Sequence, residues 1–231
     1  MRLKILSWNI WYHGDLAKIN EFLERFNADI LGLQEVMMVD KKIQLSEHIT
    51  DKLGYKYIYA PAFQIPINGL TTDVGNAIFT KNPILNRKIH NLSETDNRIA
   101  IQADVQMGNE TLHIFNTHLL HTHQQPSEIQ DLQASNLVKV LASKNTVLMG
   151  DFNALPESKA IRIINKAVKN TDAKSLPTWS VYPDGCKVCS PKGIIYKLDN
   201  IFVSKDIRSS SFKVKESRAS DHLPISVVIE V

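Results

Sequence analysis

The 231-residue sequence predicts an α/β protein in which a sandwich of sheets is flanked by helices. Three observations support this fold class. Apolar runs of strand length outnumber runs with helical spacing, several successive strands are joined by hairpin turns, and the helical stretches fall into two groups separated by strands. Because no repeat, low-complexity tract or long linker divides the chain, we expect a single domain over residues 1–231.

The first half of the chain alternates strand and helical patterns and then continues with strands. After Asp15, apolar side chains follow at helical spacing as far as residue 26. Residues 61–73 contain Pro61, Pro66 and Gly69, which favour a loop. The elements expected here are strand 3–8, helix 15–26, strand 30–36, helix 43–53, strand 55–59, loop 61–73, and strands 74–80, 84–89, 99–105 and 111–117. The last two strands are expected to form a hairpin.

The second half begins with a well-marked helix. Ser127 and Gln130 have capping-box spacing before an amphipathic run, which predicts a helix over residues 127–142. Residues 146–149 then form a short buried strand that leads to Asp151. The remaining elements expected are a helix near 158–168, a polar surface loop over 171–197, and strands 198–203, 211–214 and 225–229.

Composition restricts the partners and the compartment. The formal net charge of +3 permits a polyanionic partner but does not require one. No window approaches the roughly 18 consecutive apolar residues of a membrane span, and residues 1–8 lack the pattern of a signal peptide. We therefore expect a cytoplasmic protein with no integral membrane association, and no obligate protein partner is evident from the sequence.

The two cysteines, Cys186 and Cys189, are separated by two residues. This spacing is typical of half a zinc site, of a redox pair, or of two ordinary thiols in a loop. Since the sequence has no second pair and no helical pattern of the redox type beside them, we favour the ordinary loop.

Polar side chains recur where apolar, strand-like runs end. Each alone also fits a turn or a helix cap, but several carboxylates beside buried strands are costly unless a hard divalent cation balances them. Their oxygen donors favour Mg²⁺, with Mn²⁺ as a possible substitute, over zinc. Magnesium completes its shell with water and substrate phosphate, which indicates phosphoryl chemistry. The residues are Asn9, Glu35, Asp151, Asn153, Asp199 and Asp221.

Histidines supply groups that a metal and carboxylates lack. His222 follows Asp221 directly, and Asp199 is the best candidate to orient its ring, which predicts a base or a charge stabiliser. His118 ends another strand and could donate a hydrogen bond to a phosphoryl oxygen.

The histidines at 118, 121 and 123 also invite a rival hypothesis, a zinc hydrolase of the metallo-β-lactamase type. That family's cluster requires an Asp among its histidines, and this sequence has none there. We therefore interpret His121 and His123 as loop residues near the site, either of which could touch the substrate.

Six short motifs stand in order between residues 7 and 224. They are Ser7-Trp8-Asn9-Ile10, Leu33-Gln34-Glu35-Val36, Asn116-Thr117-His118-Leu119, Gly150-Asp151-Phe152-Asn153, Leu198-Asp199-Asn200-Ile201-Phe202-Val203 and Ser220-Asp221-His222-Leu223-Pro224. The series resembles the successive motifs of the endonuclease/exonuclease/phosphatase superfamily. Gly75-Asn76-Ala77-Ile78 is also similar to the family's strand that precedes a Pro-containing turn. Six motifs in order are far more specific than any one of them.

This resemblance implies a DNase I-like fold, a four-layer α-β-β-α sandwich of two mixed, largely antiparallel sheets with the site at one end. It implies that Asn9 and Glu35 hold Mg²⁺ and that Asp221 lies beside the metal. Arg98, Asn76 and Trp11 are candidates for substrate binding: Arg98 would reach the phosphate unless it is an ordinary surface residue, and Trp11 would stack on a base or sugar unless it packs in the core.

The resemblance also implies catalytic roles. Asp151 would activate or position the attacking water, Asn153 would hydrogen-bond the scissile phosphate, and His222 with Asp199 would form an acid/base or phosphate-stabilising pair. His118 matches the branch of pancreatic-type deoxyribonucleases and neutral sphingomyelinases. The Tyr motif of abasic-site nucleases has no convincing equivalent here.

The resulting hypothesis is a metal-dependent phosphoric diester hydrolase that uses water to cleave a phosphodiester. Mild basicity, no secretion signal and no exposed-looking hydrophobic hairpin favour nucleic acid, either DNA or RNA and including a 5′ adduct. The alternatives are a sphingomyelinase-like phospholipid phosphodiesterase, a phosphoinositide phosphatase, and a scaffold of this fold that only binds a partner.

Overall fold

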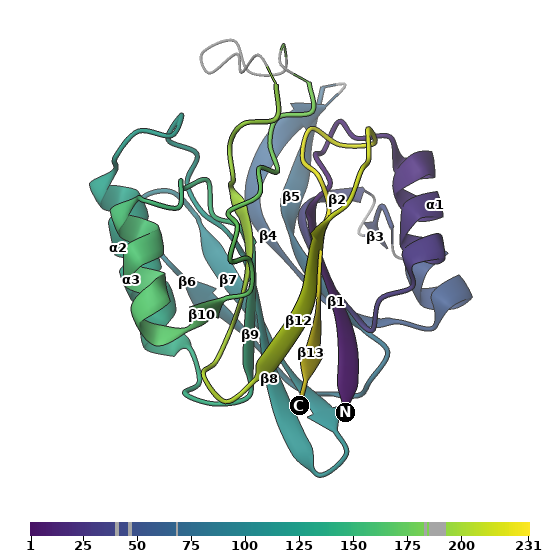
Figure 1. The fold of residues 1–231 in the computed structure, drawn as a ribbon. Coiled ribbons are helices and arrows are strands. Elements are labelled where there is room, and N and C mark those ends of the chain that lie inside the picture. Colours follow the sequence, from purple (N-terminus) through teal and green to yellow (C-terminus); the bar gives the residue numbers. More distant parts are fainter. Residues whose placement is uncertain (40–41, 46–47, 68, 183, 185–192) are drawn as a thin grey trace.

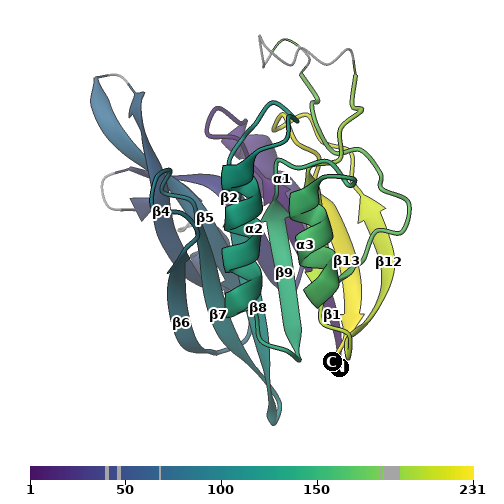
Figure 2. The ribbon, with the colours of Figure 1, turned by 90° about the vertical axis from the view of Figure 1, so that its left-hand side faces the viewer.

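Two sheets pack face to face, and helices cover their outer sides (Figure 1). The computed structural model describes residues 1–39, 42–45, 48–67, 69–182, 184 and 193–231. Helix α1 (Leu16–Phe26) covers one outer face, while α2 (Glu128–Val140) and α3 (Lys159–Ala167) lie side by side on the other (Figure 2). The predicted four-layer α-β-β-α sandwich is confirmed.

The first sheet has seven strands, six of them on a path in the order β12-β13-β1-β2-β5-β4, while β3 pairs with β2 at one side of this path. Among the described strands of this sheet, β1 and β2 are the parallel pair, because α1 carries the chain back between them. The strands are β1 (Arg2–Asn9), β2 (Ile30–Val39), β3 (Lys42–Ile43), β4 (Lys56–Ile67), β5 (Leu70–Thr80), β12 (Arg208–Val214) and β13 (Ile225–Glu230).

The second sheet has six strands in the order β10-β11-β9-β8-β7-β6. Its parallel pair is β8 and β9, which α2 connects. The strands are β6 (Ile84–Asn91), β7 (Ile99–Met107), β8 (Glu110–His118), β9 (Thr146–Asp151), β10 (Lys169–Asn170) and β11 (Asp199–Val203). Each sheet therefore contains one parallel pair with a crossover helix, and the carboxyl ends of both pairs meet at the same end of the sandwich.

Alternation along the strands builds three apolar layers. On β1, Ile5 faces the second sheet, whereas Leu6 faces α1. Helix α1 begins where the Asp15 side chain accepts from the Lys18 backbone N–H at 3.2 Å, and α2 begins at Ser127, which accepts from the Gln130 N–H at 3.3 Å. The helix start expected at Asp15 and the cap expected at Ser127 are confirmed, whereas the Gln130 side chain donates to loop carbonyls instead of completing a capping box.

The helix expected over residues 43–53 is wrong. Among the described residues of this stretch, Ile43 pairs with β2 as part of β3, and only His48–Lys52 forms a single π-helical turn, η1. The apolar residues at 43 and 45 have the two-residue spacing of a strand, so only the later part of the pattern keeps a helical period.

The loop expected over residues 61–73 is also wrong. Strands β4 and β5 continue through this stretch as a hairpin that projects beyond the body of the protein (Figure 2). Pro61 and Pro66 are tolerated because β4 is the edge strand of the sheet. The hairpin carries exposed apolar side chains, with Leu70 71% exposed. The expectation that the chain lacks an exposed hydrophobic hairpin is therefore overturned.

The polar stretch over residues 171–197 is largely irregular, as expected, but part of it is buried. Trp179 is only 4% exposed and forms isolated bridges to Tyr196 and to His222. Cys186 and Cys189 lie outside the described residues. No helix in the described part of the chain is long and apolar enough to cross a membrane.

Candidate active site

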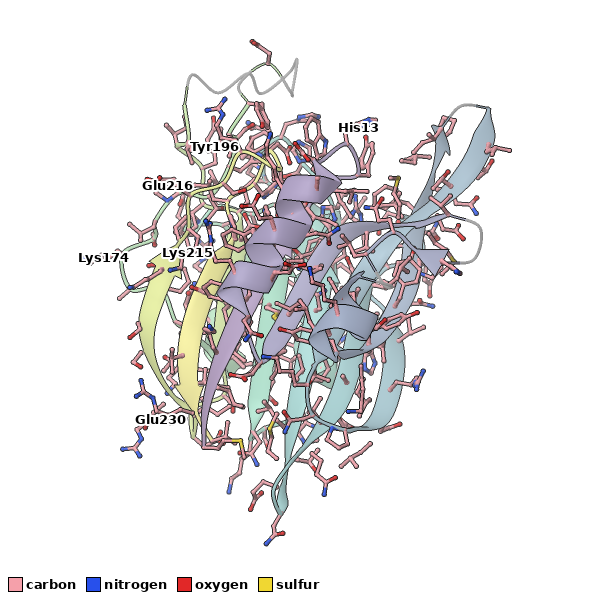
Figure 3. All side chains as sticks on the ribbon, turned by 90° about the vertical axis from the view of Figure 1, so that its right-hand side faces the viewer. His13, Lys174, Tyr196, Lys215, Glu216 and Glu230 are labelled. Atoms are coloured by element: carbon pink, nitrogen blue, oxygen red, sulfur yellow. The ribbon has the colours of Figure 1, made fainter. Side chains whose placement is uncertain are left out.

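The end of the sandwich where β1, β2, β8 and β9 finish carries the polar cluster. In Figure 3 the labelled His13 and Tyr196 mark this end, and Glu230 marks the opposite one. The segment that leads into β13 and the start of β11 arrive at the same end, because both strands run antiparallel to their neighbours. Residues far apart in the sequence therefore meet here.

Glu35 reaches the cluster through a β-bulge. The pairing of β2 with β5 shifts register between Leu33 and Val36, and Glu35 has a positive φ of 58°. A bulge redirects side chains, so Glu35 turns toward the site instead of continuing the alternation of the strand. Its carboxylate accepts from the Asn9 amide at 3.0 Å and from the Tyr12 backbone N–H at 3.3 Å.

Asp151 ends β9 directly after a glycine that the packing requires. Gly150 has a φ of +149°, and a Cβ there would lie 2.0 Å from the Thr117 carbonyl oxygen on β8. The close approach of the two strands sets the position of Asp151. The carboxylate of Asp151 then accepts from the Asn153 backbone N–H at 2.9 Å.

One oxygen of Asp151 is the centre of the cluster. Its Oδ2 accepts from the Asn9 amide at 3.1 Å and lies 3.5 Å from Nε2 of His118 and 3.5 Å from Nε2 of His222. The other ring nitrogen of His222, Nδ1, lies 2.8 Å from Oδ2 of Asp199. The predicted pairing of His222 with Asp199 is present in the structure, and His222 links the two carboxylates.

The backbone of His222 is held from two directions. The indole N–H of Trp8 on β1 donates to the His222 carbonyl at 3.0 Å, and the His222 N–H donates to the Ser220 hydroxyl at 3.1 Å. The Ser220 hydroxyl in turn donates to the Asn9 carbonyl at 2.7 Å. Buried residues of the first sheet thus fix the imidazole that serves the carboxylates of the second.

The two buried histidines have opposite protonation preferences. Burial alone would lower the pKa of His222, but Asp199 and Asp151 raise it well above its ordinary value, which favours the cationic form of the ring. Burial, and then the charges of Arg98 and His222, hold the pKa of His118 well below its ordinary value. Such divergent neighbours are typical of acid/base sites.

Two carboxyl groups of the site have raised pKa values. Burial, and then the charge of Asp221, raise the pKa of Glu35 to about 7, although its side chain keeps some exposure. Burial raises the pKa of Asp151 to about 6, with Asp199 adding to the shift and His222 opposing it. Both groups therefore hold their protons more tightly than ordinary carboxyl groups do.

Arg98 lies beside these carboxylates. Its guanidinium stands over the Phe63 ring, 5.2 Å from the centroid, and its Nη1 is buried without a hydrogen-bond partner among the described residues. Burial lowers its pKa, while Glu35 and Asp151 oppose that shift. The unpaired nitrogen leaves Arg98 with an N–H donor that suits a carboxylate or phosphate oxygen.

The other two substrate-binding candidates, Asn76 and Trp11, lie at the margin of the polar cluster. Asn76 is buried on β5, where its amide donates to the Ile99 carbonyl at 3.5 Å, and no hydrogen bond from it to the site carboxylates is found among the described residues. Trp11 is half-buried, donates its backbone N–H to the Asn9 side chain at 3.0 Å, and has its ring 6.0 Å from that of Tyr182.

Three supporting groups were missed at the sequence level. Trp179 donates its indole N–H to Asp221 at 3.1 Å, and Gln34 donates to Asn116 at 2.6 Å across the two sheets. Gln130 on α2 donates to the backbone carbonyls of residues 120, 152 and 153. A glutamine on the buried face of an amphipathic helix was a signal that could have revealed this last group.

Within the described residues, one group of three side chains has metal-binding geometry. Ligand atoms of Asp151, Asp199 and His222 all lie within 4.8 Å of one another. Because His222 already ion-pairs with both carboxylates, it balances much of the negative charge of this group. Glu35 and Asp221 lack such a histidine partner and offer harder, all-oxygen donors. His121 and His123 lie outside the group, which removes the support for a zinc cluster of three histidines.

A family model described as the endonuclease/exonuclease/phosphatase family matches residues 6–222. The chain belongs to this family. Its members are hydrolases that act on phosphoesters and are typically metal-dependent. No curated protein sequence matches the chain significantly.

Solved structures with low sequence identity share the fold. An endonuclease/exonuclease/phosphatase from Bacteroides vulgatus has a TM-score of 0.78 and 18% identity, over 100% of this chain and 99% of that one. A mannosyl-6-phosphatase from Bacteroides thetaiotaomicron has a TM-score of 0.76 and 18% identity, over 99% and 100% of the chains. ANGEL2, described as a 2′,3′-cyclic phosphatase, has a TM-score of 0.73 and 17% identity, over 99% and 95%.

Proposed function

We propose that this protein is a magnesium-dependent phosphodiesterase whose substrate is a nucleic acid. The observation that carries the proposal is the contact of one Asp151 oxygen with Asn9, His118 and His222, next to the separate pair of acids Glu35 and Asp221. A water-activating carboxylate, a cationic imidazole and a hard-cation donor set are the groups that phosphodiester hydrolysis requires.

The donor set fits Mg²⁺. Glu35 and Asp221 are oxygen donors; burial, and then the charge of Asp221, raise the pKa of Glu35 to about 7, and a divalent cation would offset both effects. Asn9 donates its amide N–H groups to Glu35 and to Asp151, so it lies between these acids and would hold the cation through its amide oxygen. When bound, Mg²⁺ supplies a Lewis acid that polarises a phosphoryl oxygen, and Mn²⁺ can take its place.

The remaining residues divide the work of hydrolysis. Asp151, with a pKa of about 6, is ionised at neutral pH and accepts a proton from the attacking water. The His222 cation, oriented by Asp199, stabilises the charge that develops on the phosphoryl group. Asn153 and neutral His118 donate hydrogen bonds to phosphate oxygens, and Arg98 binds the phosphate through its free nitrogen.

Aromatic rings beside the site support a nucleic acid substrate. Trp11 and Tyr182 lie 6.0 Å apart at the end of β1, and the Arg218 guanidinium stands 5.3 Å from the Tyr182 ring. Aromatic rings interleaved with cationic groups stack on bases and bind the adjacent phosphates. The formal charge of +3 is compatible with a polyanion.

The test is a substrate panel with purified protein in Mg²⁺, with the Asp151→Asn variant as the matched control. The panel contains single-stranded DNA, duplex DNA, RNA, a 5′-phosphotyrosyl oligonucleotide, a 2′,3′-cyclic nucleotide and mannose 6-phosphate. Cleavage of an oligonucleotide by the parent and not by the variant supports the proposal. Cleavage of the monoester or cyclic compound alone would overturn the nucleic acid assignment while keeping the reaction class. No turnover of any compound would favour a binding scaffold.

A phospholipid is the second candidate substrate, and the hairpin of β4 and β5 favours it. Pro66 and Leu70 are exposed near the hairpin tip, and Ile65 and Ile67 are half-exposed beside them. Exposed apolar groups of this kind can enter the interfacial region of a membrane. Hydrolysis of sphingomyelin or phosphoinositide vesicles that is lost in Leu70→Ser, with oligonucleotide cleavage absent throughout, would select this candidate.

A further inference from the structure

Two histidines in the loop that follows β8 form a hydrogen-bonded chain to the active-site amide. Nδ1 of His121 lies 2.9 Å from Oδ1 of Asn153, and Nε2 of His121 lies 3.1 Å from Nδ1 of His123. The two rings are nearly perpendicular, with centroids 4.6 Å apart. None of the roles proposed above requires either histidine.

The direction of each hydrogen bond follows from the chemistry of the groups. An amide oxygen can only accept, so Nδ1 of His121 must carry the hydrogen that binds Asn153. In a neutral ring, Nε2 is then an acceptor, so Nδ1 of His123 must donate to it. Each ring thereby fixes the tautomer of the next.

The nitrogen of the Asn153 side-chain amide is held in place as well. Nδ2 of Asn153 donates one hydrogen to the Leu119 carbonyl at 3.0 Å, which leaves one hydrogen on the same nitrogen. A flipped amide would place its oxygen against the Leu119 carbonyl and its nitrogen against the N–H of His121, and both contacts would be repulsive. The same flip would turn an acceptor toward any phosphate bound at this group.

We infer that His121 is a positioning residue that holds the Asn153 amide with its free N–H toward the substrate phosphate, and that His123 fixes the tautomer of His121. This inference rests on the proposed role of Asn153 in phosphodiester hydrolysis. His121 acts only through Asn153, so a change at His121 should have no effect once the Asn153 amide has been removed.

Packing is the competing explanation for His121. Its ring also lies 6.0 Å from that of Trp179, and a flat side chain could serve only to fill this space. The two explanations differ in whether Nδ1 of the His121 ring is needed for activity. Asparagine places its amide nitrogen where histidine has Nδ1, whereas glutamine places its own where histidine has Nε2, so the two variants separate hydrogen bonding from bulk.

The experiment compares His121→Asn, His121→Gln and His121→Leu in the substrate panel, with unfolding midpoints as the control for folding. Removing one oriented hydrogen bond should lower kcat about tenfold in the Gln and Leu variants, with little change in KM. His121→Asn should recover most of that loss. At the second histidine, His123→Asn should retain the activity that His123→Leu partly loses.

Two further measurements make the result decisive. In an Asn153→Ala background, His121→Gln should cause no additional loss of kcat. The ¹⁵N side-chain resonance of Asn153, identified by its absence in Asn153→Ala, should shift in His121→Gln and stay near its place in His121→Asn. This second readout needs no substrate, so it tests the inference even if no phosphodiester is cleaved.

Three results would overturn the inference. They are parent-like activity and an unshifted Asn153 resonance in His121→Gln, a His121→Asn variant as impaired as His121→Leu, or an undiminished effect of His121→Gln in the Asn153→Ala background. If one variant at 121 fails to fold, the His123→Asn and His123→Leu pair provides the same comparison one ring further out.

Discussion

The two sides of the site balance their carboxylates in different ways. On the histidine side, formed by His118, Asp151, Asp199 and His222, a single imidazole lies within 3.5 Å of both carboxylates. On the acidic side, formed by Asn9, Glu35 and Asp221, the hydrogen bonds described for the carboxylates come from neutral groups of the protein. The first side contains an imidazole that ion-pairs with both of its carboxylates, whereas no ion pair is found for Glu35 or Asp221 among the described residues, and Arg98 acts on Glu35 only through its nearby charge.

This difference gives a physical basis to the two kinds of chemistry that the family resemblance implies for these residues. A carboxylate paired with an imidazole is prepared to move a proton or to stabilise a phosphoryl group. Carboxylates that share a poorly hydrated space without a cation are prepared to bind one. We therefore interpret the histidine side as the part that performs the reaction and the acidic side as the part that holds the metal.

The largest expected effect comes from breaking the histidine side at Asp151. Asp151→Asn keeps the shape of the side chain but removes the proton acceptor, so kcat should fall by about 10²–10⁴-fold in the presence of Mg²⁺. Substrate KM should change little. Steady-state kinetics on the best substrate of the panel measures this, and Asn200→Ala, a change in the neighbouring strand, is the control. Activity within tenfold of the parent would refute the role of Asp151.

Breaking the acidic side should affect the metal before the chemistry. Glu35→Gln removes a charged donor, so the stabilisation by saturating Mg²⁺ should disappear. A metal present at about 100 times its Kd adds about 2.7 kcal/mol, which for a domain of this size raises the unfolding midpoint by several degrees. Thermal unfolding with Mg²⁺ or with EDTA measures the difference. An equal shift in Glu35→Gln and in the parent would show that the metal is held elsewhere.

The contrast also predicts how the stability of the metal-free protein depends on pH. Glu35 and Asp151 have pKa values raised from 4.5 to about 7 and from 3.8 to about 6, and the pKa of His222 is raised as well. Groups with raised pKa values stabilise the fold below their unfolded values, and that contribution is lost as pH rises through the folded values.

In EDTA, the unfolding midpoint should therefore fall as pH rises from about 6.5 to about 8, a range above the ordinary pKa of histidine in which the lowered pKa values of His118 and His121 no longer oppose the slope. Added Mg²⁺ should raise the midpoint more at pH 8 than at pH 5, because the ligands must lose their protons to bind it. Glu35→Gln should flatten part of the slope. A midpoint that rises over this range in EDTA would contradict the charge balance described for the acidic side.

The smallest expected effect concerns Arg98, which lies next to both sides. Arg98→Lys keeps the charge but loses the fork of N–H donors, so KM should rise by about three- to tenfold with a smaller change in kcat. Arg98→Met should raise KM further. Steady-state kinetics over a range of substrate concentrations measures both constants, and an unchanged KM in Arg98→Met would exclude a direct phosphate contact.

Much of the site could be predicted from sequence because its residues end strands that run in one direction. Asn9, His118 and Asp151 each finish a strand, and two parallel pairs bring those ends together. The sequence also predicted the His222–Asp199 pair. The positions of these side chains at strand ends could therefore be inferred from local sequence patterns.

Other features depend on contacts that a local pattern does not contain. The bulge that turns Glu35 into the site becomes visible only in the register of β2 against β5. Trp179 stands in a polar stretch, and only the fold reveals that its indole reaches Asp221. The hairpin was missed because the prolines that suggested a loop are compatible with an edge strand.

The position of β13 has a consequence for folding. This strand follows every other strand in the sequence, yet it lies between β12 and β1, inside the first sheet. Its partner β1 comes first in the strand order, so the pairing closes a loop of more than 200 residues, as with Leu3 and Ile229. Such a non-local contact forms slowly. The strands of the second sheet all lie within residues 84–203, so their pairings close shorter loops, and the segment that brings His222 to its carboxylates lies directly before β13.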